Sequence, residues 1–415
     1  MKQFLFGYGL ILSALIGALL AGFYWLQNAL IELFWPTIGA RPVINLLIVL
    51  VIGAIILVTQ RLWGTLPQNI IKIRVQLKTT GSVDYRRVLL QLIVPAIILV
   101  SGTSLGPEAT LVSSTVLYGV WMAEKLNYVA HNFQSADTRA RLQMLVVPHR
   151  YLQSLSVADW KNQFPSKLIR NALIGIFFTN MLIWFAIGFH ISGLHSLVMH
   201  IGVSHWQSNE LWLFGPILAV SYGLGTVIEW LLVHLKWLIA NRFTNPLILV
   251  TVGGAAIYLC GLLVPEVLFS GQHNFHLFAT NWPNQAGITL LGVAILKLIL
   301  TAISQSTGWL GGDIFPVLFA ATNFGFAISY LLPNSDQIFV VTLFVMGMAT
   351  AILKSPLLVG SLMGILYVPT NLIGIVVLAT LLMMLLKRTN KILAWIGKLQ
   401  FSFPWPKWNA IKSKD

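Results

Sequence analysis

The stretch SLGPEATLV, at residues 104–112, places one carboxylate between two apolar runs. The run QLIVPAIILVSG precedes it and SSTVLYGVW follows it, and both are apolar enough to lie in a bilayer. Gly106 and Pro107 end one helix and begin the next, since proline in a first helical turn loses no hydrogen bond. The free N–H groups of that first turn lie at the positive end of the helix dipole, where anions bind. The stretch therefore predicts a broken helix whose start is an anion site inside the membrane.

Glu108 is an acid within a predicted membrane segment, and such acids are rare and usually functional. The N–H groups of Glu108, Ala109 and Thr110 point out of the helix start, so the carboxylate can occupy an anion's place. It would leave when an anion or a proton replaces it, which makes Glu108 a candidate gate. Because removal from water disfavours a charged carboxylate, we expect faster anion flux at low pH. The alternative is a first-turn Glu that only complements the helix dipole.

The composition is that of an integral membrane protein. Of 415 residues, 57% are hydrophobic and 9% charged, and a soluble domain of this length could not bury so much apolar surface. The run LFGYGLILSALIGALLAGFYWL near the start is longer than a secretory apolar core, so we expect it to remain as a span. Cys260 is the one cysteine, which excludes a disulfide within the chain.

The sequence offers little for catalysis. No Ser/His/Asp set, Cys/His pair or phosphate-binding loop is evident, so we expect neither an enzyme nor a bound cofactor. His190, His195, His200 and His205 are five residues apart, a spacing that does not repeat on a helical face. We therefore expect no metal site.

The basic residues indicate which side of the membrane each loop occupies. The net charge of +14 would suggest nucleic acid in a soluble protein, but no basic stretch here alternates with aromatic residues on a soluble module. Lys and Arg crowd into four segments and are absent from three others. The crowded segments are 61–87, 125–170, 236–242 and 387–414, and the segments without Lys or Arg are 191–210, 269–286 and 333–337. Since basic loops stay in the cytoplasm, we expect segments 169–190 and 247–264 to run outward and segments 211–235 and 287–306 to run inward.

The apolar segments predict an all-α, polytopic membrane protein with broken or re-entrant helices. Several segments are too short to cross a bilayer, and Gly or Pro interrupts them, as in helices whose ends meet within the membrane. The predicted helices are 4–26, 42–61, 88–101, 107–124, 168–190, 211–238, 247–264, 287–306, 313–332, 338–353, 356–366 and 371–387. We expect an N-terminal half at 1–190, with a polar cytoplasmic segment at 125–167. A second half at 191–387 and a basic cytoplasmic tail at 388–415 follow, and we expect no regulatory domain.

A second candidate site lies in STGWLGGDIFPVLFAATNFG, at 306–325. Gly311 and Gly312 allow close backbone approach, and a helix begins at Asp313 or Ile314, so the N–H groups of Ile314 and Phe315 would face an anion. Asp313 would repel that anion, and we expect it to cap its own helix rather than to carry a proton. LGGD at 310–313 matches LGPE at 105–108, half a chain earlier, as duplicated halves of a transporter would.

A third stretch, RLWGTLPQNI, could form a loop that exposes the Thr65 hydroxyl and the N–H groups next to Gly64. By itself it is only a turn. Together, however, the three stretches resemble the helix starts of the CLC family of chloride channels and chloride/proton antiporters. The segment LLGVAILKLILTAISQSTGWLGGDIFPVLFAATNFG is similar to that family over its whole length, and SLGPE resembles the family motif that carries its gating glutamate.

The resemblance implies the CLC fold, two halves of inverted topology, and a homodimer. It implies that Glu108 gates and that Gly106, Pro107 and Ala109 surround the anion. Gly312, Asp313, Ile314 and Phe315 would supply backbone N–H groups to a central anion. Gly64 or Thr65 would stand at the position of the family's serine. Asp159 would be the inner acid that transfers protons in antiporters, and an exposed loop residue is the alternative.

Some positions depart from the family. The tyrosine that closes the inner side of the family's anion site falls near Leu393, where no Tyr occurs. Thr110 replaces the proline that ends the first motif. Between 137 and 165 the family has two apolar helices, but this chain is shorter and more polar there.

Three functions stay open on these grounds. The first is a CLC-like permease for chloride or a similar small anion, in the plasma membrane of a bacterium, with or without proton antiport. The second is a passive anion channel. The third is a non-transporting membrane scaffold that keeps the fold.

Overall fold

A computed structural model describes residues 1–35, 41–162, 166–192, 200–271 and 285–396. The described residues form helices and one isolated antiparallel bridge between Gly106 and Gly312, without a β-strand. Seven helical segments are long and apolar enough to cross a membrane. They are α1 (Lys2–Phe34), α2 (Pro42–Trp63), α8 (Lys167–Ile191), Ser208–Arg242 with α9 (Phe214–Arg242), α10 (Pro246–Leu263), α12 (Gly287–Ser306) and Thr370–Lys387.

The remaining helices are shorter or more polar. The last span continues as α16 (Ile373–Ile396). Among the shorter apolar helices are α4 (Val88–Leu99), α13 (Ile314–Ser329), α14 (Gln337–Leu353) and α15 (Pro356–Leu362), which continues into η4 (Met363–Tyr367). The other helices are α3 (Ile70–Thr80), α5 (Glu108–Asn132), α6 (Thr138–Val146) and α7 (Val157–Asn162).

The local sequence explains where several helices begin. Proline stands in the first turn of α2, α10 and α15, where its missing N–H costs nothing. Asn245 caps α10 by accepting the N–H of Leu247 at 2.9 Å. Asp336 caps α14 by accepting the N–H of Phe339 at 2.7 Å. These prolines and caps fix where the helices begin.

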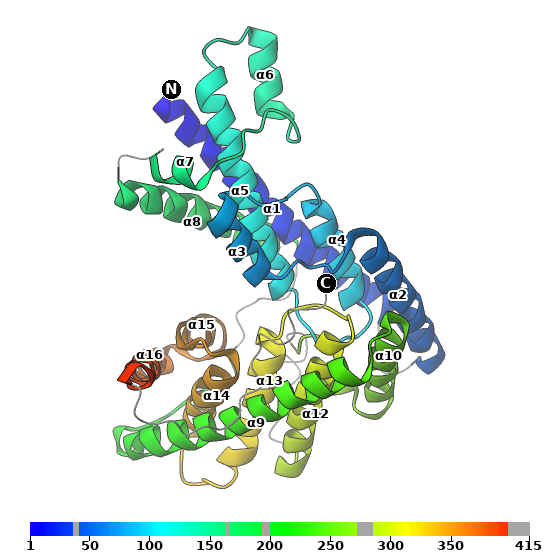
Figure 1. Ribbon diagram of the computed structural model, residues 1–415. Helices are drawn as coiled ribbons and strands as arrows, with labels where there is room; N and C mark the ends of the chain where they lie inside the picture. Colours follow the sequence, from blue (N-terminus) through cyan, green and yellow to red (C-terminus); the bar gives the residue numbers. More distant parts are fainter. Residues whose placement is uncertain (36–40, 163–165, 193–199, 272–284, 397–415) are drawn as a thin grey trace.

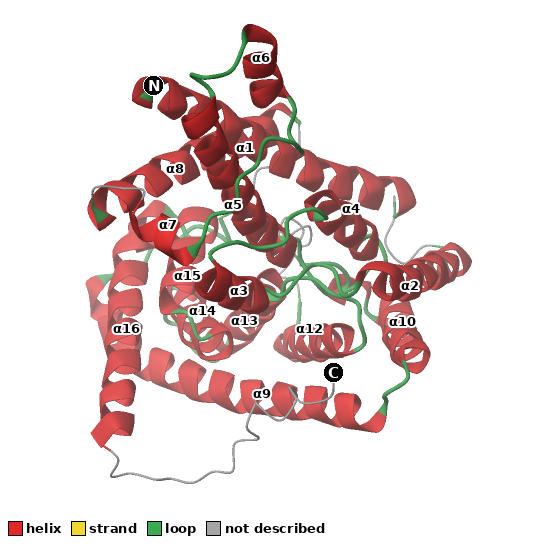
Figure 2. Cartoon of the chain, turned by 45° about the horizontal axis from the view of Figure 1, so that its top comes forward, coloured by secondary structure: helices red, strands yellow, loops and turns green. Residues whose placement is uncertain are grey.

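The two halves of the chain occupy different regions of the molecule. In Figure 1, α1–α5 and α8 lie in the upper part and α9 and α12–α16 in the lower part, with α10 beside α2. Glycines allow the closest crossings: a Cβ on Gly17 of α1 would lie 2.2 Å from Met181 O of α8. A Cβ on Gly225 of α9 would lie 2.7 Å from Met348 O of α14. Each half therefore contains a long helix that packs tightly against a second one. Helix α9 runs along one side of the fold (Figure 2).

The core sits around α13 and α14. Nearly all of the side chains of these two helices are buried, from Phe315 to Ser329 and from Ile338 to Ala351. The outer faces of the spans are apolar as well, because Leu15, Leu168 and Val220 are among the most exposed side chains. An apolar exterior around a tightly packed centre fits a molecule that is solvated by lipid.

The predicted spans are close to the observed ones, but α5 is longer than predicted. We expected it to end at 124, whereas it continues to Asn132. Glu124 and Lys125, which mark a polar boundary in the sequence, are buried and fully partnered instead. Ser82 and Tyr85 donate to the two carboxylate oxygens of Glu124. Sequence patterns cannot show such long-range partners, so the charged pair looked like a helix end.

Other boundaries also differ from the prediction. The basic helix α3 was not predicted, and α1 continues to Phe34 instead of ending at 26. α16 runs to Ile396, beyond the predicted start of the tail at 388, and residues 397–415 lie outside the described part. The polar segment at 137–165, where the family has two apolar helices, contains the short helices α6 and α7.

Candidate functional site

The loop before Glu108 is held in place by contacts with other helices. The Trp35 indole donates to Val100 O at 2.7 Å, and Thr301 of α12 donates to Ser104 O at 3.0 Å. Gly102 takes a φ of 86°, a conformation that side chains other than glycine rarely adopt. These contacts fix the direction in which α5 starts.

The starts of α5 and α13 meet in a pair of backbone hydrogen bonds. Gly106 N donates to Gly312 O at 2.8 Å, and Gly312 N donates to Gly106 O at 2.7 Å. The motifs LGPE and LGGD, half a chain apart, therefore lie side by side. The positive ends of two helix dipoles point into one place.

The Glu108 carboxylate occupies this meeting point. Its Oε1 accepts the N–H of Phe315, in the first turn of α13, at 2.8 Å. Its Oε2 lies over the two glycines, because a Cβ on Gly106 or Gly312 would approach it to 1.9 or 2.4 Å. Oε2 is buried without a hydrogen-bond partner, and the residue is only 7% exposed. The carboxylate thus sits where the N-terminus of α13 would bind an anion.

Lys297 is a buried cation next to this site. Its side chain is fully buried, and Nζ donates to the carbonyls of Val267, Leu268 and Phe269 at 2.9, 3.2 and 2.6 Å. The charge of Glu108 acts on Lys297. In its protonated form, a lysine within reach of the helix starts favours negative charge there. The sequence did carry a signal for it, since Lys297 is a lone charge in an apolar helix.

Two buried tyrosines also lie near Glu108. The Glu108 charge acts on Tyr24 of α1 and on Tyr367 at the end of η4, and Tyr24 also acts on Tyr367. Neither tyrosine was predicted from the sequence. Each belongs to an element far from position 108 in the chain, and no local pattern connects them.

This geometry places a carboxylate at a helix N-terminus, a position where an anion would also bind. A sequence model of a family described as "Voltage gated chloride channel" matches residues 160–386, more than half of the chain. The chain belongs to the voltage-gated chloride channel family.

The CLC family assignment agrees with the overall fold. The crystal structure of a CLC-type fluoride/proton antiporter superimposes with a TM-score of 0.60 at 16% identity, over 92% of this chain and 94% of that one. The fold is therefore that of a CLC protein, as the sequence predicted. With seven apolar spans among its described residues, the chain is a multi-pass membrane protein of this family.

Curated relatives match a shorter region. A "Putative ion-transport protein YfeO" of Escherichia coli O139:H28 (strain E24377A / ETEC) is 24% identical over 156 residues. The protein of the same name from Shigella flexneri matches equally. The match spans 37% of this chain and 37% of the length of these relatives.

The residues predicted to surround the anion lie together in the structure. Two of the backbone N–H groups among them, however, are already hydrogen-bonded elsewhere. Gly106, Pro107, Glu108 and Ala109 all lie at the start of α5, next to the start of α13. The N–H groups of Gly106 and Gly312 bond to each other's carbonyls, so neither points at the carboxylate.

Asp313 corrects a further expectation. It occupies the N-cap position of α13, as predicted, but its side chain accepts no hydrogen bond from the helix. The N–H of Phe315, two residues on, bonds to Glu108 instead. The prediction failed because a capping rule considers only residues that are local in sequence, whereas the better acceptor comes from α5. The charge of Asp313 also acts on Glu108.

Gly64 and Thr65 are exposed just after α2. Among the hydrogen bonds between described residues, none joins them to Glu108 or to the start of α13. Asn69, a few residues further, caps α3 by accepting the N–H of Ile71 at 2.8 Å. Their role at the family's serine position therefore stays a prediction.

Asp159 lies on the surface, at the start of α7. Its Oδ2 accepts the N–H of Ser156 at 2.8 Å, and its own N–H donates to Ser156 Oγ at 3.2 Å. The Ser156 backbone N–H, and then its hydroxyl, hold the pKa of Asp159 below its usual value. This reciprocal cap describes a solvated helix start, and its role in proton transfer stays a prediction.

Other predicted positions fall outside this site. The side chain of Leu393, near the family's tyrosine position, and His195 lie outside the described residues. Within the described part of the chain, no group of three His, Cys, Asp or Glu side chains could hold a metal ion.

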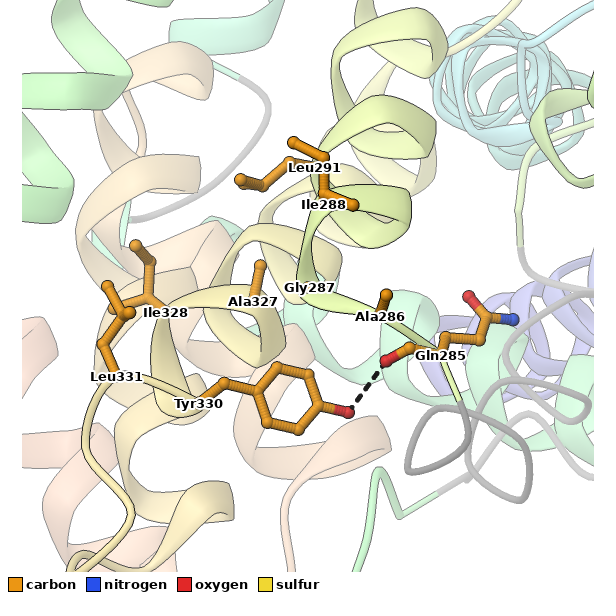
Figure 3. A pocket seen from close by; sticks show the side chains of 9 residues that line it. All are labelled: Gln285, Ala286, Gly287, Ile288, Leu291, Ala327, Ile328, Tyr330 and Leu331. Atoms are coloured by element: carbon orange, nitrogen blue, oxygen red, sulfur yellow. Dashed lines mark hydrogen bonds between the residues drawn. The ribbon is translucent and has the colours of Figure 1, made fainter.

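A shallow apolar groove lies at the other end of α12 and α13. It has a volume of about 530 Å³ and is lined by Ile288, Ile328 and Leu331, among others (Figure 3). The Tyr330 hydroxyl donates to Gln285 O at 3.1 Å across one edge. The groove is far along both helices from the start of α13, so it is separate from the Glu108 site.

Proposed function

We propose that the chain is an anion permease, which moves chloride or a similar small inorganic anion across the bilayer with Glu108 as its gate. The observation that carries the proposal is the hydrogen bond from Phe315 N–H to Glu108 Oε1. A carboxylate on the N-terminus of a buried helix is chemically a bound anion on a tether. When it leaves, the same N–H groups become available to a free anion.

The neighbouring charges support the same role. When it is protonated, Lys297 would favour negative charge near the helix starts, whether the charge belongs to the carboxylate or to an anion that replaces it. Asp313 has the opposite effect and disfavours a second negative charge. These opposing charges would let the site bind one anion at a time with moderate affinity. Permeation requires such reversible binding.

Protonation offers a second way to release the gate. Burial away from water favours the neutral carboxyl, and a neutral carboxyl no longer holds a charge-assisted bond to Phe315 N–H. Coupling of anion movement to protons would follow if the proton reaches Glu108 from the opposite side. The structural relative is described as a fluoride/proton antiporter, which makes fluoride a further candidate anion. A passive channel is the alternative.

The family membership supports the setting that we propose. The protein would form a homodimer in a bacterial plasma membrane, with its basic C-terminus in the cytoplasm. It would need no cofactor and would not act as an enzyme.

The experiment is anion efflux from liposomes that contain purified wild-type protein or Glu108→Gln. The glutamine mimics a protonated carboxyl, so its efflux at neutral pH should equal that of the wild type at about pH 5. Glu32→Gln is the matched control. Glu32 is exposed near the C-terminal end of α1, so this variant should behave like the wild type. Equal, pH-independent efflux from all three proteins would contradict the gating role. No efflux of chloride, nitrate or fluoride from any of them would favour the non-transporting scaffold.

A further inference from the structure

A row of buried hydroxyl groups runs along α5 from the Glu108 site. Thr110 and Ser114 are fully buried and Tyr118 is 7% exposed, yet none of their hydroxyl oxygens has a hydrogen-bond partner. Buried polar groups without a partner are rare and cost about 1–3 kcal/mol each. Three of them in succession on one helix call for a ligand that is polar and small.

Other buried hydroxyls in this chain show the usual alternative. Thr59, Thr322, Thr342 and Thr380 each donate to the carbonyl four residues earlier, at 2.7–2.8 Å. Ser113, next to Ser114, does the same at 2.7 Å and also accepts from Gln91. Ser304 and Thr350 lack partners too, but each stands alone in its helix. The row on α5 is thus distinct from ordinary back-bonded serines and threonines.

The row leads toward the C-terminal end of α5, which the charge distribution predicts to lie in the cytoplasm. Positions 110, 114, 118 and 125 follow at four, four and seven residues, so they share one side of the helix. Tyr118 belongs to the same buried hydrophobic cluster as Tyr8, Leu12 and Ile16 of α1, and α1 and α5 are in contact. Side chains in a helix lean toward its N-terminus, so the Tyr118 hydroxyl leans toward Ser114 and the Glu108 site.

This side of α5 ends at Lys125, a fully buried lysine about 25 Å along the helix from Glu108. Its Nζ donates to Val147 O at 2.6 Å and to Arg150 O at 2.8 Å. Those carbonyls belong to the segment that departs from the family between 137 and 165. The neighbouring carboxylate, Glu124, bonds to Ser82 and Tyr85 rather than to Lys125.

We propose that the side of α5 with Thr110, Ser114, Tyr118 and Lys125 conducts protons between the cytoplasm and Glu108. Hydroxyls one turn apart are about 6 Å from each other, so one water molecule would span each of these steps. The step from Tyr118 to Lys125 is about 10 Å along the helix and would need more than one water molecule. Lys125 passes a proton to the first water, every hydroxyl accepts one proton and gives up another, and Glu108 becomes neutral. Lys125 then takes a new proton from the cytoplasm, which balances the transfer.

This inference rests on the proposed function, since it supplies the proton that releases the Glu108 gate. It also assigns a different route from the exposed Asp159. The groups that face Glu108 from other elements, namely Lys297, Asp313, Tyr24 and Tyr367, belong to the anion site and not to this row.

The test measures anion and proton fluxes together in liposomes for Ser114→Ala and Tyr118→Phe. Each variant removes a hydroxyl that has no partner, so neither should destabilise the fold. We expect proton flux to fall by about tenfold, equivalent to about 1.4 kcal/mol, while anion flux stays within about twofold of the wild type. Ser113→Ala is the matched control, since it removes a partnered serine one residue away, and its proton-to-anion ratio should equal that of the wild type.

The outcomes separate this inference from the proposed function. Wild-type anion flux without proton movement would overturn the route but leave the permease intact. An unchanged ratio in Ser114→Ala and Tyr118→Phe, with a loss in Asp159→Asn, would also overturn it in favour of Asp159. Absence of anion flux in the wild type would remove both.

Discussion

Glycine is required at position 312 because the Glu108 carboxylate lies where a side chain would be. In Gly312→Ala, the new methyl group would lie 2.4 Å from Glu108 Oε2 and 3.0 Å from Ala109 N. We expect it to push the carboxylate from Phe315 N–H, to raise anion flux at neutral pH several-fold, and to weaken the pH dependence. Overpacking should also cost about 1–3 kcal/mol of stability. Liposome efflux and thermal unfolding in detergent measure both effects.

Gly119→Ala is the control for this prediction. Gly119 lies in α5, the helix that carries Glu108, with open space around it, and alanine there should be neutral or stabilising by about 0.5–1 kcal/mol. If Gly312→Ala gave the flux and pH profile of Gly119→Ala, the carboxylate would not be held over the glycines.

At the scale of single residues, the sequence predicted the centre of the site but not its surroundings. Glu108 and Phe315 could be found because each stands at a helix start with its own local signature. Lys297 was missed although a lone lysine in an apolar helix was visible. Tyr24 and Tyr367 could not be found, because only the tertiary structure brings α1 and η4 to α5.

At the scale of elements, α5 shows how a buried charged pair changes a helix boundary. Its C-terminal end is anchored through Glu124 and Lys125 to residues 82–85 and 147–150. Apolar periodicity stops at this pair, so the sequence indicated a helix end. The long apolar spans were predicted well because their length and composition are local properties.

The anchor at the end of α5 predicts a pH effect on stability. Burial, and then the bond to Glu124, raise the pKa of Tyr85, so its phenol stays protonated after tyrosines of the unfolded chain ionise near 10.0. The stability that the raised pKa of Tyr85 contributes to the fold is therefore fully present below about pH 10. It is lost as the pH rises further. Thermal unfolding at about pH 9 and pH 11 should show a larger decrease for the wild type than for Tyr85→Phe. Equal decreases would mean that the phenol does not anchor α5.

At the scale of the whole molecule, the distribution of charge predicts the orientation in the membrane. The segment around 200–210 should face outward and the turn around 135 inward. In a Cys260→Ser background, an impermeant thiol reagent added to intact cells should label Val203→Cys but not Ser135→Cys. Both positions are exposed, so accessibility alone does not distinguish them. Labelling of Ser135→Cys before permeabilisation would reverse the orientation.

The two halves meet in several places, and the function that we propose depends on one of them. The bridge between Gly106 and Gly312 joins the starts of α5 and α13, and it brings a carboxylate from the first half to an N–H of the second. The most direct measurement is therefore efflux of chloride or fluoride from liposomes with wild-type protein and with Glu108→Ala, while external pH is recorded. We predict anion efflux in both, with acid-stimulated efflux and proton movement in the wild type alone. Identical pH dependence and proton movement in Glu108→Ala would contradict the central claim that this carboxylate is the gate.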